Sequence, residues 1–297
     1  MALWVGFQGE HGAFSEEAIV RKFGTAARPV PFQSLREVFD SVMKLEANLA
    51  VVPIENSLEG GVTETYDLLL ANELKITGEI KVRIRHCLIS KPGASLMEIA
   101  TVLSHPQALA QCRNKLAKLG LKSQPFYDTA GSVKFIADST DVSLAAIASE
   151  YSAMVYGMKV LRRSMEDSKS NYTRFLVLGR RTKGRSKGAY KTSIVFSTRH
   201  KPGSLVKALE PFAREGINLT KVESRPTKQT PWEYYFHIDL DGSVYDGPVS
   251  RAIKTLKTRA DFVRVLGSYP ADSGKSHPRG RSFRLVHRSS EPRRLTS

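Results

Sequence analysis

Residues 49–62 read LAVVPIENSLEGGV, and this stretch gives the clearest indication of the fold. Residues 49–54 form a short run without a polar side chain, which is typical of a strand buried on both faces. The run ends directly in a carboxylate, an amide and a hydroxyl, on Glu55, Asn56 and Ser57. Burying such groups without partners is costly, so this strand end is either a helix N-cap or a place where a ligand supplies the partners.

Strands and helices are predicted to alternate on both sides of this stretch, over the first 178 residues. The expected strands cover 3–7, 49–54, 76–88, 101–104, 121–127, 144–148 and 175–178. The helix after Ser34 has the strongest signals, because Ser34 and Glu37 match a capping box and apolar residues recur at helical spacing from Leu35 to Val42. This order predicts an α/β fold with largely parallel sheets, in which ligands bind beyond the carboxyl ends of the strands.

Polar clusters follow four of the expected strands at that end. They cover residues 8–10, 55–57, 104–107 and 128–130. One polar loop would mean little, but four in a row indicate a lined cleft. The residues predicted to bind a ligand there are Asn56, Ser57, Gln107, Thr129 and Ala130.

Residues 171–175 read NYTRF, a polar segment that leads into the last of these strands. Its spacing alone favours an edge strand. The Arg174 guanidinium could grip a carboxylate of a ligand through two parallel hydrogen bonds, or it could form an internal ion pair that orients the strand. The sequence leaves these two alternatives open.

Residues 190–270 follow a different pattern, in which two helices, at 202–215 and 249–258, are set among four strands. The strands are expected at 191–197, 217–222, 233–240 and 262–266. This βαββαβ order is the ferredoxin-like arrangement. Gly203 opens the first helix, whose free N–H groups could bind a carboxylate, and Asn218 places an amide at the entrance to the next strand. An ordinary helix start and C-cap is the alternative.

The net charge of +16 first suggests nucleic-acid binding, but its distribution argues otherwise. Residues 180–191 contain six basic and no acidic residues, and residues 271–297 contain seven basic and two acidic ones. Both stretches are rich in Gly, Ser and basic residues, and they are predicted to be a flexible linker at 181–189 and a disordered tail at 271–297. A weak contact with a polyanion is the alternative, and nucleic acid is not expected to be the main partner.

The sequence argues against several other kinds of protein. No apolar run approaches the ~18–20 residues of a membrane span, and the N-terminus lacks a secretory signal, so a soluble, unprocessed chain is expected. Only two cysteines, Cys87 and Cys112, are present, which favours a reducing cytoplasm and no disulfide framework. No histidine or cysteine pair has metal-ligand spacing, and the glycines at 6, 9 and 12 do not form GxGxxG. Neither a metal site nor a dinucleotide site is expected.

Taken together, these segments resemble prephenate dehydratases fused to a regulatory ACT domain. The resemblance covers about residues 3 to 269. The matching segments are residues 6–15, 53–62 with 67–69, 105–112, 128–130, 145–148 and 167–175, and in the second domain 203–206 and 223–226. Departures are few: Gly131-Ser132-Val133 stands where small alanines are usual, and Ser204 replaces an alanine.

The resemblance implies a two-lobed α/β catalytic domain, built like a periplasmic binding protein, followed by a ferredoxin-like ACT domain. The implied limits are 1–180 for the catalytic domain, with lobe one at 1–76 and 170–180 and lobe two at 77–169, and 190–270 for the ACT domain. The implied reaction converts prephenate to phenylpyruvate in phenylalanine synthesis, without a cofactor. Arogenate is the alternative substrate, and a non-catalytic amino-acid sensor on the same folds is the alternative function.

The resemblance also assigns roles to residues. Thr173 matches the family's essential threonine and would donate to the leaving hydroxyl, with Glu55 as the alternative proton source. Arg174 and Phe175 complete the substrate-binding set. Phenylalanine would act as feedback inhibitor at the interface of a homodimer or homotetramer. The effector-binding residues implied are Gly203, Ser204, Leu205, Val206, Asn218, Glu223, Ser224, Arg225 and Pro226.

Overall fold

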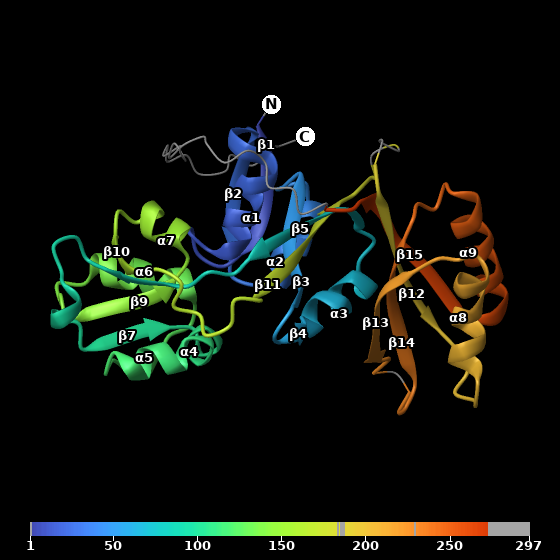
Figure 1. Ribbon diagram of the computed structural model, residues 1–297. Coiled ribbons are helices and arrows are strands. Elements are labelled where there is room, and N and C mark those ends of the chain that lie inside the picture. The colour runs from blue at the N-terminus through green and yellow to red at the C-terminus, as the bar shows by residue number, and fades with distance from the viewer. Residues whose placement is uncertain (1, 183, 185–187, 229, 273–297) are drawn as a thin grey trace. The chain divides into compact units, whose positions relative to one another are not determined.

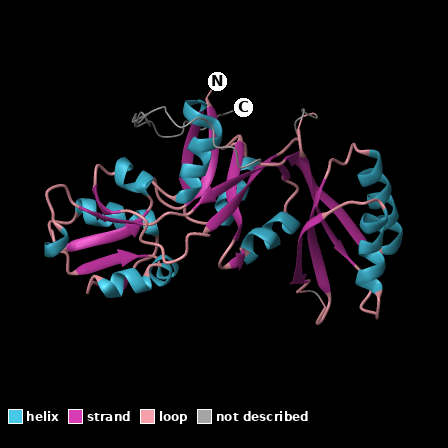
Figure 2. Ribbon diagram, in the orientation of Figure 1, coloured by secondary structure: helices cyan, strands magenta, loops and turns pink. Residues whose placement is uncertain are grey.

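This computed structural model describes residues 2–182, 184, 188–228 and 230–272. Within them the chain forms three β-sheets flanked by helices (Figures 1 and 2). The strands of the first sheet are β1 (Leu3–Gln8), β2 (Ala27–Phe32), β3 (Leu49–Asn56), β4 (Gly60–Gly61), β5 (Lys75–Arg83) and β11 (Tyr172–Gly179). Their order is β2-β1-β3-β11-β5, and the short β4 pairs with β3. The pairings of β1 with β2 and with β3 are parallel.

The apolar stretch at 49–54 forms β3 as predicted, and Ala50, Val51 and Val52 are fully buried in it. The helices of this lobe are α1 (Phe14–Phe23), α2 (Leu35–Met43) and α3 (Thr63–Ala71). The Ser34 side chain caps α2 by accepting from the Glu37 N–H at 3.2 Å. The predicted apolar stripe of α2 is its buried face, which fixes this helix against the sheet.

The second sheet has the order β10-β6-β9-β7-β8. Its strands are β6 (Cys87–Ser90), β7 (Thr101–Ser104), β8 (Lys122–Pro125), β9 (Leu144–Ala148) and β10 (Lys159–Arg162). The pairings of β7 with β8 and β9 are parallel, whereas β6 runs antiparallel to β9 and β10. The helices of this lobe are α4 (Pro106–Gln111), α5 (Arg113–Lys118), α6 (Thr129–Asp138) and α7 (Glu150–Val155). Separate apolar clusters around Val102 and Leu103 fill its core.

The structure corrects three of the predicted strands. The strand expected at 76–88 is two strands, β5 and β6, in different sheets, because the alternating pattern continues through residues 84–86 where the chain crosses between lobes. Glu55 and Asn56 lie within β3, not after it, and no helix begins there. The segment 171–175 does not form an edge strand, because β11 lies between β3 and β5. The strands β2, β4 and β10 were not predicted.

The third sheet confirms the predicted βαββαβ order. Its elements are β12 (Tyr190–Ser197), α8 (Ser204–Arg214), β13 (Leu219–Pro226), β14 (Tyr234–Asp241), α9 (Gly247–Arg259) and β15 (Phe262–Pro270). The sheet is antiparallel with the order β13-β14-β12-β15. Ile194 and Phe196 of β12 pack with α8 and α9 in one apolar cluster, so both helices cover the same face.

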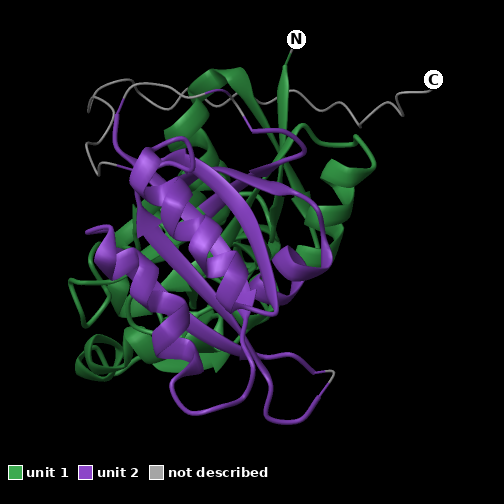
Figure 3. Ribbon diagram, turned by 90° about the vertical axis from the view of Figure 1, so that its right-hand side faces the viewer, with its two compact units in different colours: residues 1–65, 80–175, 276–297 green, residues 66–79, 176–275 purple. Residues whose placement is uncertain are grey.

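Two compact units divide the described chain (Figure 3). One contains residues 2–65 and 80–175, and the other contains 66–79 together with 176–272. In the second unit α3 and the start of β5 pack on the face of the C-terminal sheet that α8 and α9 leave open. The Arg264 side chain there donates to the carbonyl oxygens of Leu69 and Leu70. A Cβ on Gly267 would lie 2.2 Å from the Ile76 carbonyl oxygen, so only glycine fits this approach.

None of the helices in the described ranges is long and apolar enough to cross a membrane. Of the tail predicted at 271–297, only Ala271 and Asp272 are described. The rest of that tail and four positions of the predicted linker lie outside the described residues, so the predictions made for them are untested.

Candidate active site

The Asn56 side chain, at the end of β3, is bonded at both of its polar atoms. Its Oδ1 accepts from the backbone N–H groups of Leu58 and Glu59, at 2.9 and 3.1 Å. Since a backbone N–H can only donate, these bonds fix which end of the amide is the oxygen. The Nδ2 atom is thereby directed to Asn171 Oδ1 and Thr173 Oγ1, at 2.8 and 3.0 Å.

Thr173 is the second residue of β11 and is half-buried. Its hydroxyl oxygen accepts the hydrogen bond from Asn56. A hydroxyl that accepts one bond still has its own proton to donate. The arrangement therefore presents Thr173 as a hydrogen-bond donor to whatever lies beside it.

Ser57 joins the turn after β3 to the start of β11. Its N–H donates to the Tyr172 carbonyl at 2.8 Å, and its hydroxyl donates to the Ser170 carbonyl at 2.6 Å. The same hydroxyl accepts from the Tyr172 N–H at 2.9 Å. The serine thus holds the segment before Thr173 in register with Asn56.

Gln111, the last residue of α4, brings the second lobe to this cluster. Its Oε1 accepts from Asn171 Nδ2 at 2.7 Å and lies 3.0 Å from His86 Nε2. Its Nε2 donates to the Glu59 carboxylate at 3.2 Å, which fixes the amide orientation, because a carboxylate only accepts. Burial lowers the pKa of His86, which favours the neutral ring, and its proton is then required on Nε2.

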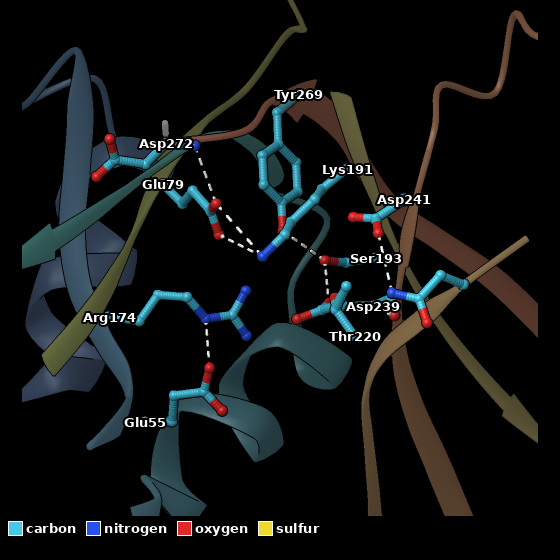
Figure 4. A network of polar contacts seen from close by, with 11 residues as sticks. Glu55, Glu79, Arg174, Lys191, Ser193, Thr220, Asp239, Asp241, Tyr269 and Asp272 are labelled. Carbon is cyan, nitrogen blue, oxygen red and sulfur yellow. Dashed lines mark hydrogen bonds and ion pairs between the residues drawn. The ribbon is translucent and has the colours of Figure 1, made fainter. Parts of the chain in front are cut away.

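Glu55 and Arg174, the chain neighbours of Asn56 and Thr173, form an ion pair, with Arg174 Nε 2.6 Å from Glu55 Oε1 (Figure 4). The Arg174 side chain is 6% exposed and that of Glu55 33%. A guanidinium so deeply buried requires an anionic partner, and Glu55 supplies it. Of the two alternatives for Arg174, the geometry favours the internal ion pair.

The glycine-rich loop after β1 also joins the lobes. The Ser149 hydroxyl donates to the Gly12 carbonyl at 3.1 Å, and a Cβ on Gly12 would lie 2.9 Å from the Ser152 backbone. Glu10 accepts from Tyr127 Oη at 3.3 Å and from Lys134 Nζ at 3.0 Å. The close approach of the Ser152 backbone explains why glycine stands at position 12.

The structure does not join the remaining residues predicted to bind substrate to the cluster by hydrogen bonds. Gln107 is exposed at the start of α4, and Thr129 is half-buried at the start of α6, which Asp128 caps. Ala130 and Phe175 are buried core residues. Among the described residues, no hydrogen bond links Gln107 or Thr129 to Asn56 or Thr173.

The predicted site residues do not include Gln111, Asn171 or His86, although all three are polar and close to the cluster. Asn171 and His86 are almost fully buried, at 0 and 2% exposure. The available signal was weak: Asn171 directly precedes the strand that contains Thr173, and Gln111 lies within a segment already noted for its resemblance. The spacing of residues along the sequence does not show that Gln111, from the second lobe, meets Asn171 and His86.

The residues predicted to bind an effector lie at the start of α8, on β13 and, for Asn218, directly before β13. Gly203 is the left-handed N-cap of α8, with φ +79° and open space around it. Ser204 and Leu205 are half-buried, and Val206 is 71% exposed. Residues 223–226 lie on the edge strand β13, with Ser224 and Pro226 exposed and Glu223 and Arg225 half-buried. The Asn218 side chain donates to Asp241 at 3.0 Å.

Both cysteines are buried and unpaired, and burial raises the pKa of Cys87 to about 11 and that of Cys112 further. Neither thiol is available as a nucleophile. Within the described ranges no cluster of three or more His, Cys, Asp or Glu side chains could hold a metal ion.

Two models of known protein families match the chain. A prephenate dehydratase family model matches residues 5–183, and an ACT domain model matches residues 192–255. The chain is 42% identical to arogenate dehydratase/prephenate dehydratase 2 of Arabidopsis thaliana over 91% of its own length and 73% of that protein.

Two solved structures are similar to the chain over most of their length. The prephenate dehydratase of Arthrobacter aurescens in complex with L-Phe is 33% identical, with a TM-score of 0.84 and coverage of 94% of this chain and 93% of that one. A protein described as GqqA, a novel type of quorum quenching acylase, is also 33% identical, with a TM-score of 0.85 and coverage of 91 and 98%. From the family match and the order of its two domains, the chain belongs to the prephenate dehydratase family and has a C-terminal ACT domain.

Proposed function

We propose that the chain converts prephenate to phenylpyruvate, with Thr173 as donor to the leaving hydroxyl. The observation that carries this role is the hydrogen bond from Asn56 Nδ2 to Thr173 Oγ1 at 3.0 Å, which leaves the threonine proton for the substrate. The reaction takes up one proton and releases carbon dioxide and water. Aromatisation of the ring supplies much of the driving force, so the protein has mainly to assist departure of the hydroxyl and to hold the carboxylate in a dry site.

Glu55 is the less favoured proton source. In its ion pair with Arg174 it is ionised, and an ionised carboxylate has no proton to give. A threonine hydroxyl is too weak an acid to be left as an alkoxide, so we assign Thr173 the role of stabilising the departing hydroxyl by a hydrogen bond. The proton that converts this hydroxyl to water is the one that the reaction takes up from solvent. Removing one preorganised donor of this kind costs about 10²–10³-fold in turnover in other enzymes.

Purified protein assayed with prephenate and with arogenate tests the proposed function. Phenylpyruvate from prephenate is the expected product, and phenylalanine from arogenate would identify the alternative substrate. The Arabidopsis relative is named for both activities. Turnover of neither substrate would reject the function.

The replacement Arg174→Lys is expected to lower stability more than substrate affinity. Lysine keeps the charge but not the planar guanidinium that places Nε 2.6 Å from Glu55 Oε1, and interactions of buried charged groups contribute about 1.5–3 kcal/mol. Equilibrium unfolding of the substrate-free protein should show a loss of this size, with KM near that of the parent. A raised KM with unchanged stability would mean instead that Arg174 grips a substrate carboxylate.

We propose that L-phenylalanine binds the ACT domain as a feedback inhibitor, between two copies of the chain. The structure of the Arthrobacter relative was solved in complex with L-Phe, which supports the choice of L-phenylalanine as the ligand. At the start of α8 the Ser204 N–H donates to the Lys201 carbonyl at 3.1 Å, so the N–H groups of Leu205 and Val206 are the ones directed to a ligand carboxylate. The effector residues predicted from 203–206, 218 and 223–226 are retained in this proposal.

The replacement Gly203→Val should weaken phenylalanine binding at least about tenfold, a loss of about 1.4 kcal/mol. Valine disfavours φ near +79°, so the turn that presents the helix N–H groups must change. Calorimetry with L-phenylalanine is the measurement. Gly24→Val is the matched control, because Gly24 has φ +58°, equally open surroundings and a place in the first lobe. Undiminished binding by Gly203→Val would reject this effector site.

We also propose the domain limits 1–180, with a linker at 181–189, and 190–270. The family matches at 5–183 and 192–255 support them. Location in the cytoplasm and assembly as a homodimer or homotetramer remain predictions.

A further inference from the structure

Asn171 lies where the chain returns from the second lobe to the first, directly before β11. The other crossing between the lobes is formed by residues 84–86, between β5 and β6. The two crossings are bonded to each other, because the Ile84 N–H donates to the Asn171 carbonyl at 2.9 Å. Asn171 is therefore part of the connection between the two lobes.

The Asn171 side chain is fully buried and bonded at both polar atoms. Its Oδ1 accepts from Asn56 in the first lobe at 2.8 Å, and its Nδ2 donates to Gln111 in the second lobe at 2.7 Å. Asn56 in turn donates to Thr173 at 3.0 Å. A continuous chain of hydrogen bonds thus runs from the end of α4 to the threonine hydroxyl.

The direction of every bond in this chain is fixed from outside it. The backbone N–H groups of Leu58 and Glu59 fix the oxygen of Asn56, and the Glu59 carboxylate fixes the nitrogen of Gln111. Position 171 must therefore accept from one neighbour and donate to the other. A side-chain amide does both, whereas an ionised carboxylate can only accept and an apolar side chain does neither.

We propose that Asn171 is a positioning residue that couples the placement of Gln111 to the orientation of the Thr173 hydroxyl. Without the Asn171 acceptor, the Asn56 amide loses one of its two donor bonds and is free to turn away from Thr173. The threonine proton is then no longer confined to the side where the substrate lies. This proposal rests on the proposed function, because Thr173 is taken there as the donor.

Turnover of prephenate by Asn171→Ala tests the proposal. The kcat should fall about 10- to 10²-fold with KM within about threefold, since misplacing a catalytic group by about 1 Å can cost 10²-fold. In a Thr173→Ala background, Asn171→Ala should lower kcat less than about twofold, because its effect acts through Thr173. Ser41→Ala is the control: Ser41 is also fully buried and donates to the Val38 carbonyl at 2.8 Å, but among the described residues no hydrogen bond links its side chain to the cluster. Its kcat should equal that of the parent.

The variant Asn171→Asp covers the case in which Asn171→Ala does not fold. The ionised carboxylate keeps the bond from Asn56 but cannot donate to Gln111, so kcat should be reduced and should recover relative to the parent as the pH falls and the carboxyl is protonated. Parental kcat in the folded Asn171 variants, or an equal loss with and without Thr173, would overturn the proposal. An inactive parent, or a fully active Thr173→Ala, would instead reject the proposed function.

Discussion

The replacement Thr173→Ala is expected to lower kcat by about 10²-fold or more and to leave the fold intact. Losing a positioned donor to a leaving group has an effect of this size in other enzymes. Thr173 is half-buried, and its hydroxyl accepts a single side-chain bond, from Asn56. The free energy of unfolding should therefore change by only about 1 kcal/mol, the usual net contribution of one hydrogen bond.

Steady-state kinetics and equilibrium unfolding of the same preparations separate these two effects. Thr173→Ser is the matched control, because serine keeps the hydroxyl and the bond from Asn56, and most of the turnover should remain. If the kcat of Thr173→Ala stays within a few-fold of that of the parent, the donor to the leaving hydroxyl is another group. If it loses most of its stability, the threonine is chiefly structural.

The sequence was sufficient to predict those elements in which local pattern and tertiary environment agree. In α2 the cap at Ser34, the apolar stripe and the buried face coincide. Local pattern failed where the chain changes sheet without changing its alternation. Residues 76–88 keep a period of two, yet the chain leaves one sheet at Arg83 and enters another at Cys87. A period of two reports which side chains are buried, not which strand lies beside them.

The candidate site was predictable only in part, for a related reason. Asn56 and Thr173 were found because each lies in a recognisable motif at the end or start of a strand. Their direct hydrogen bond joins residues 117 positions apart, and the link through Gln111 comes from the other lobe. Predicting such contacts requires knowing that β3 and β11 are neighbours, whereas the spacing of 171–175 favoured an edge strand.

A second large effect is expected in the other compact unit, at a buried ion pair between β5 and β12. Lys191 Nζ lies 3.4 Å from both oxygens of Glu79 (Figure 4). The Glu79 side chain is fully buried and that of Lys191 is 12% exposed. The Asp272 N–H also donates to Glu79 at 3.0 Å. The pair ties the strand that leads out of the first lobe to the first strand of the C-terminal sheet.

The pair belongs to a polar face of that sheet. Residues 191 and 193 lie on the same side of β12, since side chains alternate along a strand. The Ser193 hydroxyl bonds to Asp239 and lies 2.8 Å from the Tyr269 hydroxyl, and all three side chains are buried (Figure 4). Because α3 and β5 cover this face, its charges are largely shielded from water. Their partners must come from the protein.

The replacement Lys191→Met should therefore destabilise the protein by about 3–5 kcal/mol, the usual cost of leaving a buried charge without its partner. Equilibrium urea unfolding is the measurement. The double variant Glu79→Gln, Lys191→Met should recover most of this loss, because it removes both charges together. Arg251→Met is the matched control, since Arg251 is 63% exposed in its pair with Glu215 and the loss of this pair should change stability little. If Lys191→Met is as harmless as Arg251→Met, the ion pair does not hold β5 to the C-terminal sheet.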